Sequence, residues 1–326
     1  MATDLQFPTA KAQHYVPKFY LKGFTDQFGV LWVCEKFKPI RASKPKKEAH
    51  RPDYYTHAEQ GERDETAEDN FKIVESRVAE PIRKLANPQY KITPEKAGEL
   101  YLFVALMFAR VPSWREFIDD RLTEAVKQMH HSDAQHKERF YDTCRKLETA
   151  SGDSLGIEYE SLRLMFLKRE YEVMQTSVAY NLGAMFRSAF TIFDELMNYD
   201  YEILYAPDNR YFLTSDAPVF TVQRDGMGMG SVGAGFGVPG VEVLFPLNKR
   251  ACLRLKRGIE PNPRVVSEKA VEQINRVVMR TAGRHLYSSE GYRKTARLFD
   301  QYGCRVRPGR ESFLTKPTTD SSHVAD

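Results

Sequence analysis

Two glutamates in the first third of the chain have a spacing that suits acid–base or metal chemistry. Glu68 and Glu75 are seven residues apart in a stretch, 65–85, whose apolar residues recur at helical spacing. At about 100° per residue, both lie nearly in line on one helix face, at the border of the apolar stripe. Stacked carboxylates there could bind a divalent metal ion or exchange protons. They could equally be solvated and paired with nearby cationic side chains.

A histidine near the N-terminus could serve the same chemistry. His14 precedes Pro17, and Pro17 and Gly23 have the residue types that begin and end a short helix. The positive end of that helix would favour the neutral imidazole, which can accept a proton or bind a metal ion. A single histidine is also common as a hydrogen-bonded structural residue, so both interpretations stay open.

An arginine and an aspartate complete the candidates that the residues alone indicate. Arg110 ends a helix predicted from Pro94 to about Val111 that is apolar on nearly every face. An enclosed guanidinium needs an anionic partner, and Glu75 is a candidate, so Arg110 is either half of a structural salt bridge or a clamp for a substrate anion. Asp216 is predicted where a strand ends in a turn, either as a turn former or as a site carboxylate.

The predicted secondary structure that positions these residues changes from helices to strands along the chain. Residues 65–111 and 159–197 read as long helices, and short apolar or β-branched runs follow between 201 and 255. Helices grouped before strands predict an α+β fold, in which a helical N-terminal half packs against a mainly antiparallel C-terminal sheet. We expect a single domain over residues 1–312 and a disordered tail over 313–326.

A basic segment, 36–47, interrupts the N-terminal region. It contains six lysines or arginines and two prolines. Like charges and prolines are typical of a solvated loop, and such a loop could also contact nucleic acid.

Composition and charge favour a soluble globular protein. Hydrophobic residues make up 42% of the 326 residues, and the net charge of +4 permits a nucleic acid partner without requiring one. Four widely separated cysteines without a CxxC pair predict reduced thiols and a cytoplasmic location. The N-terminus lacks the apolar core of a signal peptide, and the longest apolar run, 100–109, is about half of a membrane span, so no membrane association is expected. Neither G-x-S-x-G nor H-E-x-x-H occurs.

Several short motifs, taken in order, resemble a known family. They are an N-terminal motif over 14–24, formed by His14-Tyr15-Val16-Pro17 with Phe19, Leu21 and Phe24, the segment 214–219 that begins T-S-D-A-P, and the F-P-L of 245–247. With 108–112 and 273–275, they are similar to DUF4238, a domain family of unknown function, from His14 to about Tyr287. The resemblance selects polar positions that could share one catalytic pocket: His14, Glu75, Arg110, Asp216 and Asn275. It implies no reaction, because the family has no assigned activity.

The leading hypothesis is a hydrolase, namely a metal-dependent nuclease or phosphodiesterase acting on nucleic acid. Glu75 and Asp216, with Glu68, would bind Mg²⁺ or Mn²⁺ through oxygen ligands. His14 would be the general base or a ligand, and Arg110 would stabilise charge on the phosphate. One alternative is a non-enzymatic binding or regulatory protein whose polar network only fixes the fold. A further alternative is metal-independent RNA cleavage by His14 and Arg110.

Overall fold

The computed structural model describes residues 11–59, 62–173, 177–223, 233–260 and 262–303. The tail predicted to be disordered, 313–326, therefore lies outside the described residues. Helices with mainly antiparallel sheets confirm the predicted α+β class. The chain divides into two compact units, 1–115 with 178–326, and 116–177. A single domain over 1–312 stays a prediction, because compact units need not fold independently.

Three helices of the first unit enclose most of its larger core. They are α2 (Thr66–Lys84), α3 (Pro94–Ala109) and α7 (Val178–Leu196). Pro94 begins α3 as predicted, and the Thr93 side chain accepts a hydrogen bond from the backbone N–H of Lys96 at 3.3 Å. The apolar residues of α3 are buried around most of its circumference because α2 and α7 both pack against it.

A five-stranded sheet lies against these helices, with the order β12-β7-β11-β10-β9. Its strands are β7 (Asp200–Tyr205), β9 (Phe220–Gln223), β10 (Val241–Pro246), β11 (Ala251–Lys256) and β12 (Arg264–Val265). All pairs are antiparallel except β12 with β7. Alternate residues serve two cores: Val243 and Phe245 face the helices, whereas Leu244 belongs to a second core.

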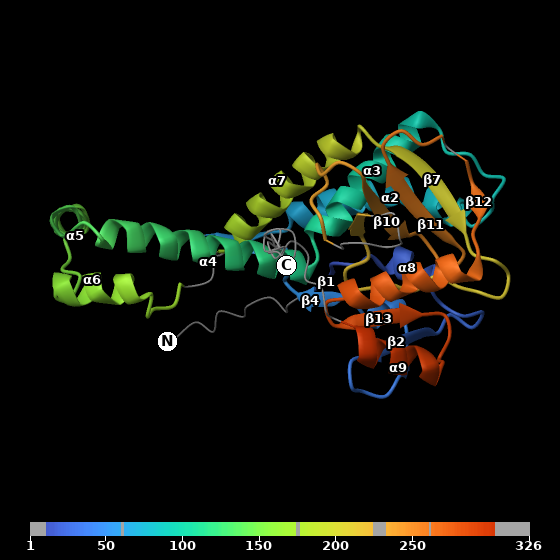
Figure 1. Ribbon diagram of the computed structural model, residues 1–326, viewed down its shortest axis with the longest axis horizontal. Coiled ribbons are helices and arrows are strands. Elements are labelled where there is room, and N and C mark those ends of the chain that lie inside the picture. The colour runs from blue at the N-terminus through green and yellow to red at the C-terminus, as the bar shows by residue number, and fades with distance from the viewer. Residues whose placement is uncertain (1–10, 60–61, 174–176, 224–232, 261, 304–326) are drawn as a thin grey trace, which may run out of the picture. The chain divides into compact units, whose positions relative to one another are not determined.

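The second core forms around α8 (Glu268–Thr281). Figure 1 shows this helix on the side of the five-stranded sheet away from α2 and α3. Val271, Ile274 and Val278 recur on one face of α8 and are buried there, which is the stripe expected of a helix covering a sheet. The short helix α9 (Arg293–Tyr302) contributes Phe299 to the same core.

A four-stranded sheet joins the two ends of the chain, with the order β3-β2-β13-β8. Its strands are β2 (Leu31–Glu35), β3 (Arg41–Ser43), β8 (Thr214–Ser215) and β13 (His285–Ser288). The basic segment 36–47, predicted as a solvated loop, thus contains β3 and the 3-10 helix η1 (Pro45–Lys47). Two small two-stranded antiparallel sheets pair β1 (Ala12–His14) with β4 (His50–Pro52), and β5 (His57–Glu59) with β6 (Glu62–Asp64).

The N-terminal motif forms the predicted short helix, α1 (Lys18–Lys22), between Pro17 and Gly23. Its residue Tyr20 is fully buried and stacks on Phe245 with ring centroids 5.1 Å apart. The Tyr20 hydroxyl donates to the Pro246 carbonyl at 2.6 Å and lies 2.7 Å from Thr214 Oγ1. Tyr20 therefore fixes α1 to β10 and to β8.

The second unit is helical. It contains most of α4 (Pro112–Ala134), together with α5 (Lys137–Ser151) and α6 (Tyr159–Lys168), around a small core with Phe140 and Cys144. The helical region predicted over 159–197 contains two helices, α6 and α7. Helix α6 ends where Arg169 adopts a positive φ of 58°, which breaks the helical path.

Candidate functional site

Three of the predicted site residues line one cleft. His14, Glu68 and Glu75 surround a cavity of about 960 Å³ that is built from β1, α1, η1 and α2. We call it the His14 cleft. Its other polar lining includes five lysines: Lys18, Lys22, Lys44, Lys46 and Lys72.

Strand pairing places His14 in the cleft. His14 lies opposite His50 in the antiparallel β1–β4 pair, with ring centroids 5.1 Å apart. Its neighbour Gln13 is buried and anchors this strand pair, accepting from the backbone N–H of Tyr55 at 2.6 Å and donating to Thr56 Oγ1 at 2.8 Å. The buried side chain of Gln13 and the pairing with β4 therefore fix the position of His14.

The His14 imidazole is held in its neutral form. Burial lowers its pKa from 6.5 to about 4, and the charges of Lys18 and His50 lower it further, against a backbone hydrogen bond with Lys46 that raises it. The neutral state agrees with the sequence prediction, but the cause is burial and nearby cations. In the described part of the chain, the enclosed Nε2 of His14 and Nδ1 of His50 have no hydrogen-bond partner.

Glu68 is the unpaired carboxylate of the cleft. It makes no hydrogen bond or ion pair to any other described residue. Burial raises its pKa and the neighbouring Glu75 raises it further, whereas Lys72 and Arg110 lower it. A histidine with a lowered pKa and a glutamate with a raised pKa thus line the same cleft, which is a pattern found where protons are transferred.

Glu75 pairs with Arg110, as the sequence suggested. Arg110 Nη1 donates to Glu75 Oε1 at 2.9 Å, and its guanidinium lies over the rings of Phe71 and Phe103 at 5.2 and 5.9 Å. Arg110 is buried behind Glu75 and is not among the residues that line the cleft. Its observed contacts make it a positioning residue for Glu75.

The hydroxyl of Tyr55 lies in the same polar region. Tyr55 is fully buried, and the charges of Arg110, Glu68 and Glu75 all act on its pKa, which burial raises well above its ordinary value. Among described atoms, Tyr55 Oη and Arg110 Nε have no hydrogen-bond partner. Sequence reasoning missed Tyr55 and His50, because only the pairing of distant strands brings His50 opposite His14 and Tyr55 next to Gln13.

Most lysines of the cleft have no ion-pair partner among the described residues. Within the described ranges, Lys18, Lys22, Lys44 and Lys46 form no ion pair, whereas Lys72 pairs with Asp69 at 2.8 Å. Two of the four come from the basic segment 36–47, which the sequence predicts as a solvated loop that could also contact nucleic acid. Four unpaired cations around one cavity favour an anionic ligand.

The carboxylate of Asp216 bonds to backbone N–H groups and does not line the cleft. It lies directly after β8, at the predicted strand end, and accepts hydrogen bonds from the backbone N–H groups of Gly283, Arg284 and His285 at 2.8, 2.8 and 3.0 Å. Burial raises its pKa, and His285 and the three N–H donors oppose that rise. Asp216 is not among the described residues that line the His14 cleft.

The side chain of Asn275 also makes hydrogen bonds to the backbone. Its Oδ1 accepts from the N–H of Leu213 and its Nδ2 donates to the carbonyl of Tyr211, both at 2.9 Å. These two bonds hold residues 211–213, which precede β8, and the N–H of Phe212 donates to the carbonyl of Lys249 at 3.0 Å. Asn275 lines a different cavity, of about 590 Å³.

The predicted metal ligands are not gathered. Among the described residues, no group of three or more His, Cys, Asp or Glu side chains is placed to hold a metal ion. Glu68 and Glu75 share the cleft, but Asp216 is bonded to the segment 283–285. A single metal site on all three carboxylates is therefore not formed in this structure.

Comparison with protein families identifies the chain. Residues 12–291 match the model of a family described as "Protein of unknown function (DUF4238)". The chain belongs to this family. No curated protein and no solved structure matches it. The resemblance inferred from the motifs is thus confirmed over nearly the span expected.

In this DUF4238 chain, the recognised motifs meet in space. Tyr20 of the N-terminal motif contacts Thr214 of the T-S-D-A-P segment and Pro246 of F-P-L. Much of the motif pattern therefore maintains the fold that carries the His14 cleft. None of the described helices is both long and apolar enough to cross a membrane.

Proposed function

We propose that this DUF4238 protein is a phosphodiesterase that cleaves RNA in the His14 cleft. The proposal rests on one observation. The cleft combines an unpaired imidazole nitrogen and an unpaired carboxylate, His14 and Glu68, with four lysines that have no ion-pair partner among described residues.

The lysines would bind the substrate phosphates. Lys18 and Lys46 are close enough to His14 to interact with it through charge or a backbone hydrogen bond, so a phosphate bound by them would lie near the imidazole. The negative charge of that phosphate would raise the pKa of His14 from about 4 toward neutrality. Substrate binding would thus turn a weak base into an effective one.

Proton transfer would use the two groups with displaced pKa values. The 2′-hydroxyl oxygen attacks phosphorus while its proton passes to His14 Nε2, and the bond from phosphorus to the 5′-oxygen breaks as that oxygen takes a proton from Glu68. The products are a 2′,3′-cyclic phosphate and a 5′-hydroxyl. Because Nε2 is enclosed in this structure, the Lys46 segment or the imidazole must move as substrate enters.

A metal-dependent version of this activity is the second candidate. Glu68 and Glu75, seven residues apart on α2, both line the cleft. Mg²⁺ is often held by one or two carboxylates together with substrate phosphates, so these two could bind Mg²⁺ or Mn²⁺ once a substrate is present. Glu75 would then have to share its carboxylate with Arg110.

A non-enzymatic nucleic-acid-binding or regulatory protein remains the competing class. It is favoured by the contacts of Asp216 and Asn275, which bond to backbone, and of Glu75, which bonds to a buried arginine. In that case the lysines would bind nucleic acid and no bond would break.

An assay of RNA and DNA degradation in Mg²⁺, Mn²⁺ or EDTA separates these candidates. We expect RNA cleavage in EDTA, with cyclic phosphate ends, and at least about a hundredfold loss in His14→Gln and in Glu68→Gln. His136→Gln and Glu95→Gln, exposed residues that line neither this cleft nor another described cavity, are the matched controls. Cleavage only with metal would favour the second candidate. Binding without cleavage under every condition would overturn the enzymatic proposal.

We also place this activity in the cytoplasm. Cys34, Cys144 and Cys252 are buried and unpaired, which suits a reducing compartment. Alkylation of the denatured chain taken from cells would report these thiols as reduced. Their recovery as disulfides would contradict the placement.

A further inference from the structure

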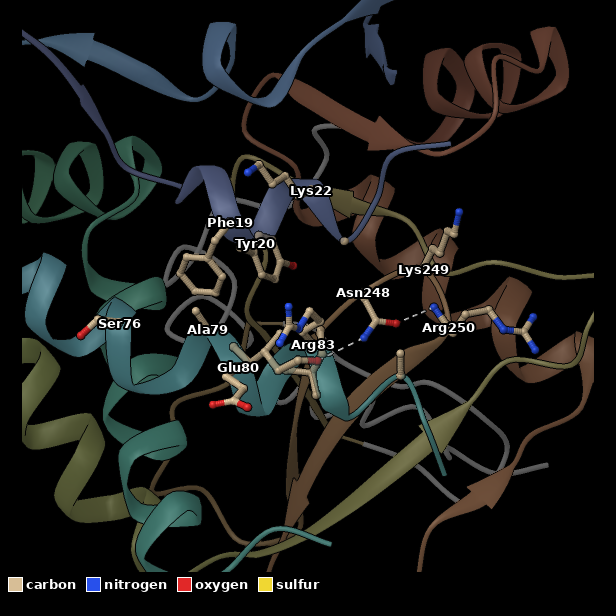
Figure 2. A pocket seen from close by; sticks show the side chains of 14 residues that line it. Phe19, Tyr20, Lys22, Ser76, Ala79, Glu80, Arg83, Asn248, Lys249 and Arg250 are labelled. Carbon is tan, nitrogen blue, oxygen red and sulfur yellow. Dashed lines mark hydrogen bonds between the residues drawn. The ribbon is translucent and has the colours of Figure 1, made fainter. Parts of the chain in front are cut away.

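A second cavity adjoins the His14 cleft. It has a volume of about 550 Å³ and shares Phe19 and Lys22 of α1 with the cleft. We call it the Asn248 pocket, after the residue at the turn between β10 and β11. Its lining comes from α1, the second half of α2 and this turn (Figure 2).

Close packing fixes the walls of this pocket. A Cβ atom on Gly23 would lie 2.9 Å from the Cβ of Asn248, so only glycine lets the end of α1 approach the turn. The backbone N–H of Lys249 donates to the Gly23 carbonyl at 3.0 Å. Asn248 Oδ1 accepts from the N–H groups of Arg250 and Ala251 at 2.8 and 3.0 Å. The pocket is therefore preformed.

The lining combines apolar surface with free positive charge. The apolar and aromatic part is contributed by Phe19, Tyr20, Ala79, Ile82, Ala86 and Leu247. Lys22 and Arg83 form no ion pair within the described ranges, whereas Lys249 donates to the Thr25 carbonyl and Arg250 pairs with Asp208. The one carboxylate among the described residues of the lining, Glu80, is paired with Lys84 at 2.8 Å. Phe19 and Arg83 are both drawn in Figure 2, on α1 and α2. Such a lining suits a flat aromatic group attached to an anion.

We propose that the Asn248 pocket binds a nucleobase of the strand whose phosphate lies in the His14 cleft, so that the substrate is single-stranded. This inference rests on the proposed function. The shared Lys22 lies where the phosphate between the two cavities would pass, and 550 Å³ is within the size range of small-molecule pockets. A base paired in a duplex cannot enter, because its faces are covered by its neighbours.

The test measures binding of two uncleavable probes. One is a 2′-O-methyl RNA tetranucleotide, and the other has the same backbone without bases. We expect the protein to bind the base-bearing probe at least about tenfold more tightly. Ala79→Phe fills the pocket and should abolish this preference while affinity for the abasic probe is unchanged. Ile73→Phe, an exposed residue of α2 that lines neither cavity, should preserve it. Ala86→Phe is the second pocket variant if Ala79→Phe does not fold.

A charge variant gives an independent measurement. Arg83→Gln should weaken binding of both probes and reduce the dependence of log K on log salt by about one unit. Arg77→Gln, six residues earlier on α2 and outside both cavities, should do neither.

Two results would overturn the proposal: equal binding of base-bearing and abasic probes by the wild type, or a base preference that survives in both pocket variants. Tighter binding of a duplex than of the single strand would do the same. Failure of the proposed function is distinguishable, because it abolishes RNA cleavage and leaves the probe measurements intact.

Discussion

Arg110 Nη1 donates to Glu75 Oε1 across 2.9 Å, and the two side chains differ in exposure, 1% for the arginine and 24% for the glutamate. Loss of the ion pair would therefore be more costly for the buried arginine than for the partly exposed glutamate. A charge enclosed by Phe71 and Phe103 has no water to replace a lost partner. Glu75 stays partly exposed while it is paired, and it also lines the His14 cleft.

Removing the negative charge of this pair should destabilise the protein. We expect Glu75→Gln to lower the free energy of unfolding by about 3 kcal/mol, because a buried guanidinium loses its counter-ion. Glu80→Gln on the same helix breaks only an exposed pair with Lys84 and should cost less than about 0.5 kcal/mol. Urea denaturation of both variants measures the difference. Equal values would mean that Arg110 gains little from Glu75.

Loss of the Tyr20 hydroxyl should weaken the junction of the three motifs. Tyr20→Phe keeps the stacking on Phe245 but leaves Thr214 Oγ1 and the Pro246 carbonyl without this partner. We expect a loss of about 1–2 kcal/mol in the free energy of unfolding. The same change at Tyr292, which is 59% exposed, is the control and should be nearly neutral. A neutral Tyr20→Phe would show that water replaces the hydroxyl.

Asp216 gives a test that separates a structural from a chemical role. Asp216→Ala leaves three backbone N–H groups, of Gly283, Arg284 and His285, without their acceptor, and should cost about 3 kcal/mol in unfolding free energy. The exposed Asp208→Ala should cost much less. Thermal unfolding and RNA cleavage are measured on the same samples. Loss of activity at an unchanged melting temperature would return Asp216 to the site as a metal ligand.

The low pKa of His14 predicts a specific pH dependence of stability. Its pKa is about 4 in the folded chain and 6.5 when unperturbed, so between these values the unfolded state binds more protons. Stability should therefore fall as pH is lowered from about 6.5 to 4, by on the order of 2 kcal/mol from this residue after allowing for its partial exposure. In His14→Gln that part of the slope should disappear.

Denaturation at several pH values between 4 and 7 provides the measurement. His136→Gln, an exposed histidine, should keep the slope of the wild type. An unchanged slope in His14→Gln would indicate that the imidazole is more accessible to water than in this structure.

Local sequence patterns were enough to predict the helices that carry part of the candidate site. The seven-residue spacing of Glu68 and Glu75 placed both carboxylates on one face of α2, and the all-round apolar pattern of α3 predicted the enclosed Arg110 and its partner. These predictions succeeded because each depends on the period of one helix or on two adjacent helices.

Asp216 and Asn275 show where that reasoning stops. Asp216 follows β8 and Asn275 lies on α8, but a buried carboxylate or amide can bond either to a ligand or to the backbone, and the residue type does not distinguish the two. The N–H groups of Gly283 and Leu213, which donate those bonds, come from other parts of the chain. The choice between pocket and fold was therefore not readable from the motif.

By itself, the sequence determined the α+β class, the family, and His14, Glu68 and Glu75 as polar candidates. The tertiary structure alone decided which companions they have. His50 lies opposite His14 through the β1–β4 pairing, and α1 and η1 bring the unpaired lysines into the same cleft. The contact of Tyr20 with β8 and β10 fixes α1 there. Contacts between residues this far apart in sequence produce no periodic pattern in the local sequence. They form when separate elements bury their surfaces against one another.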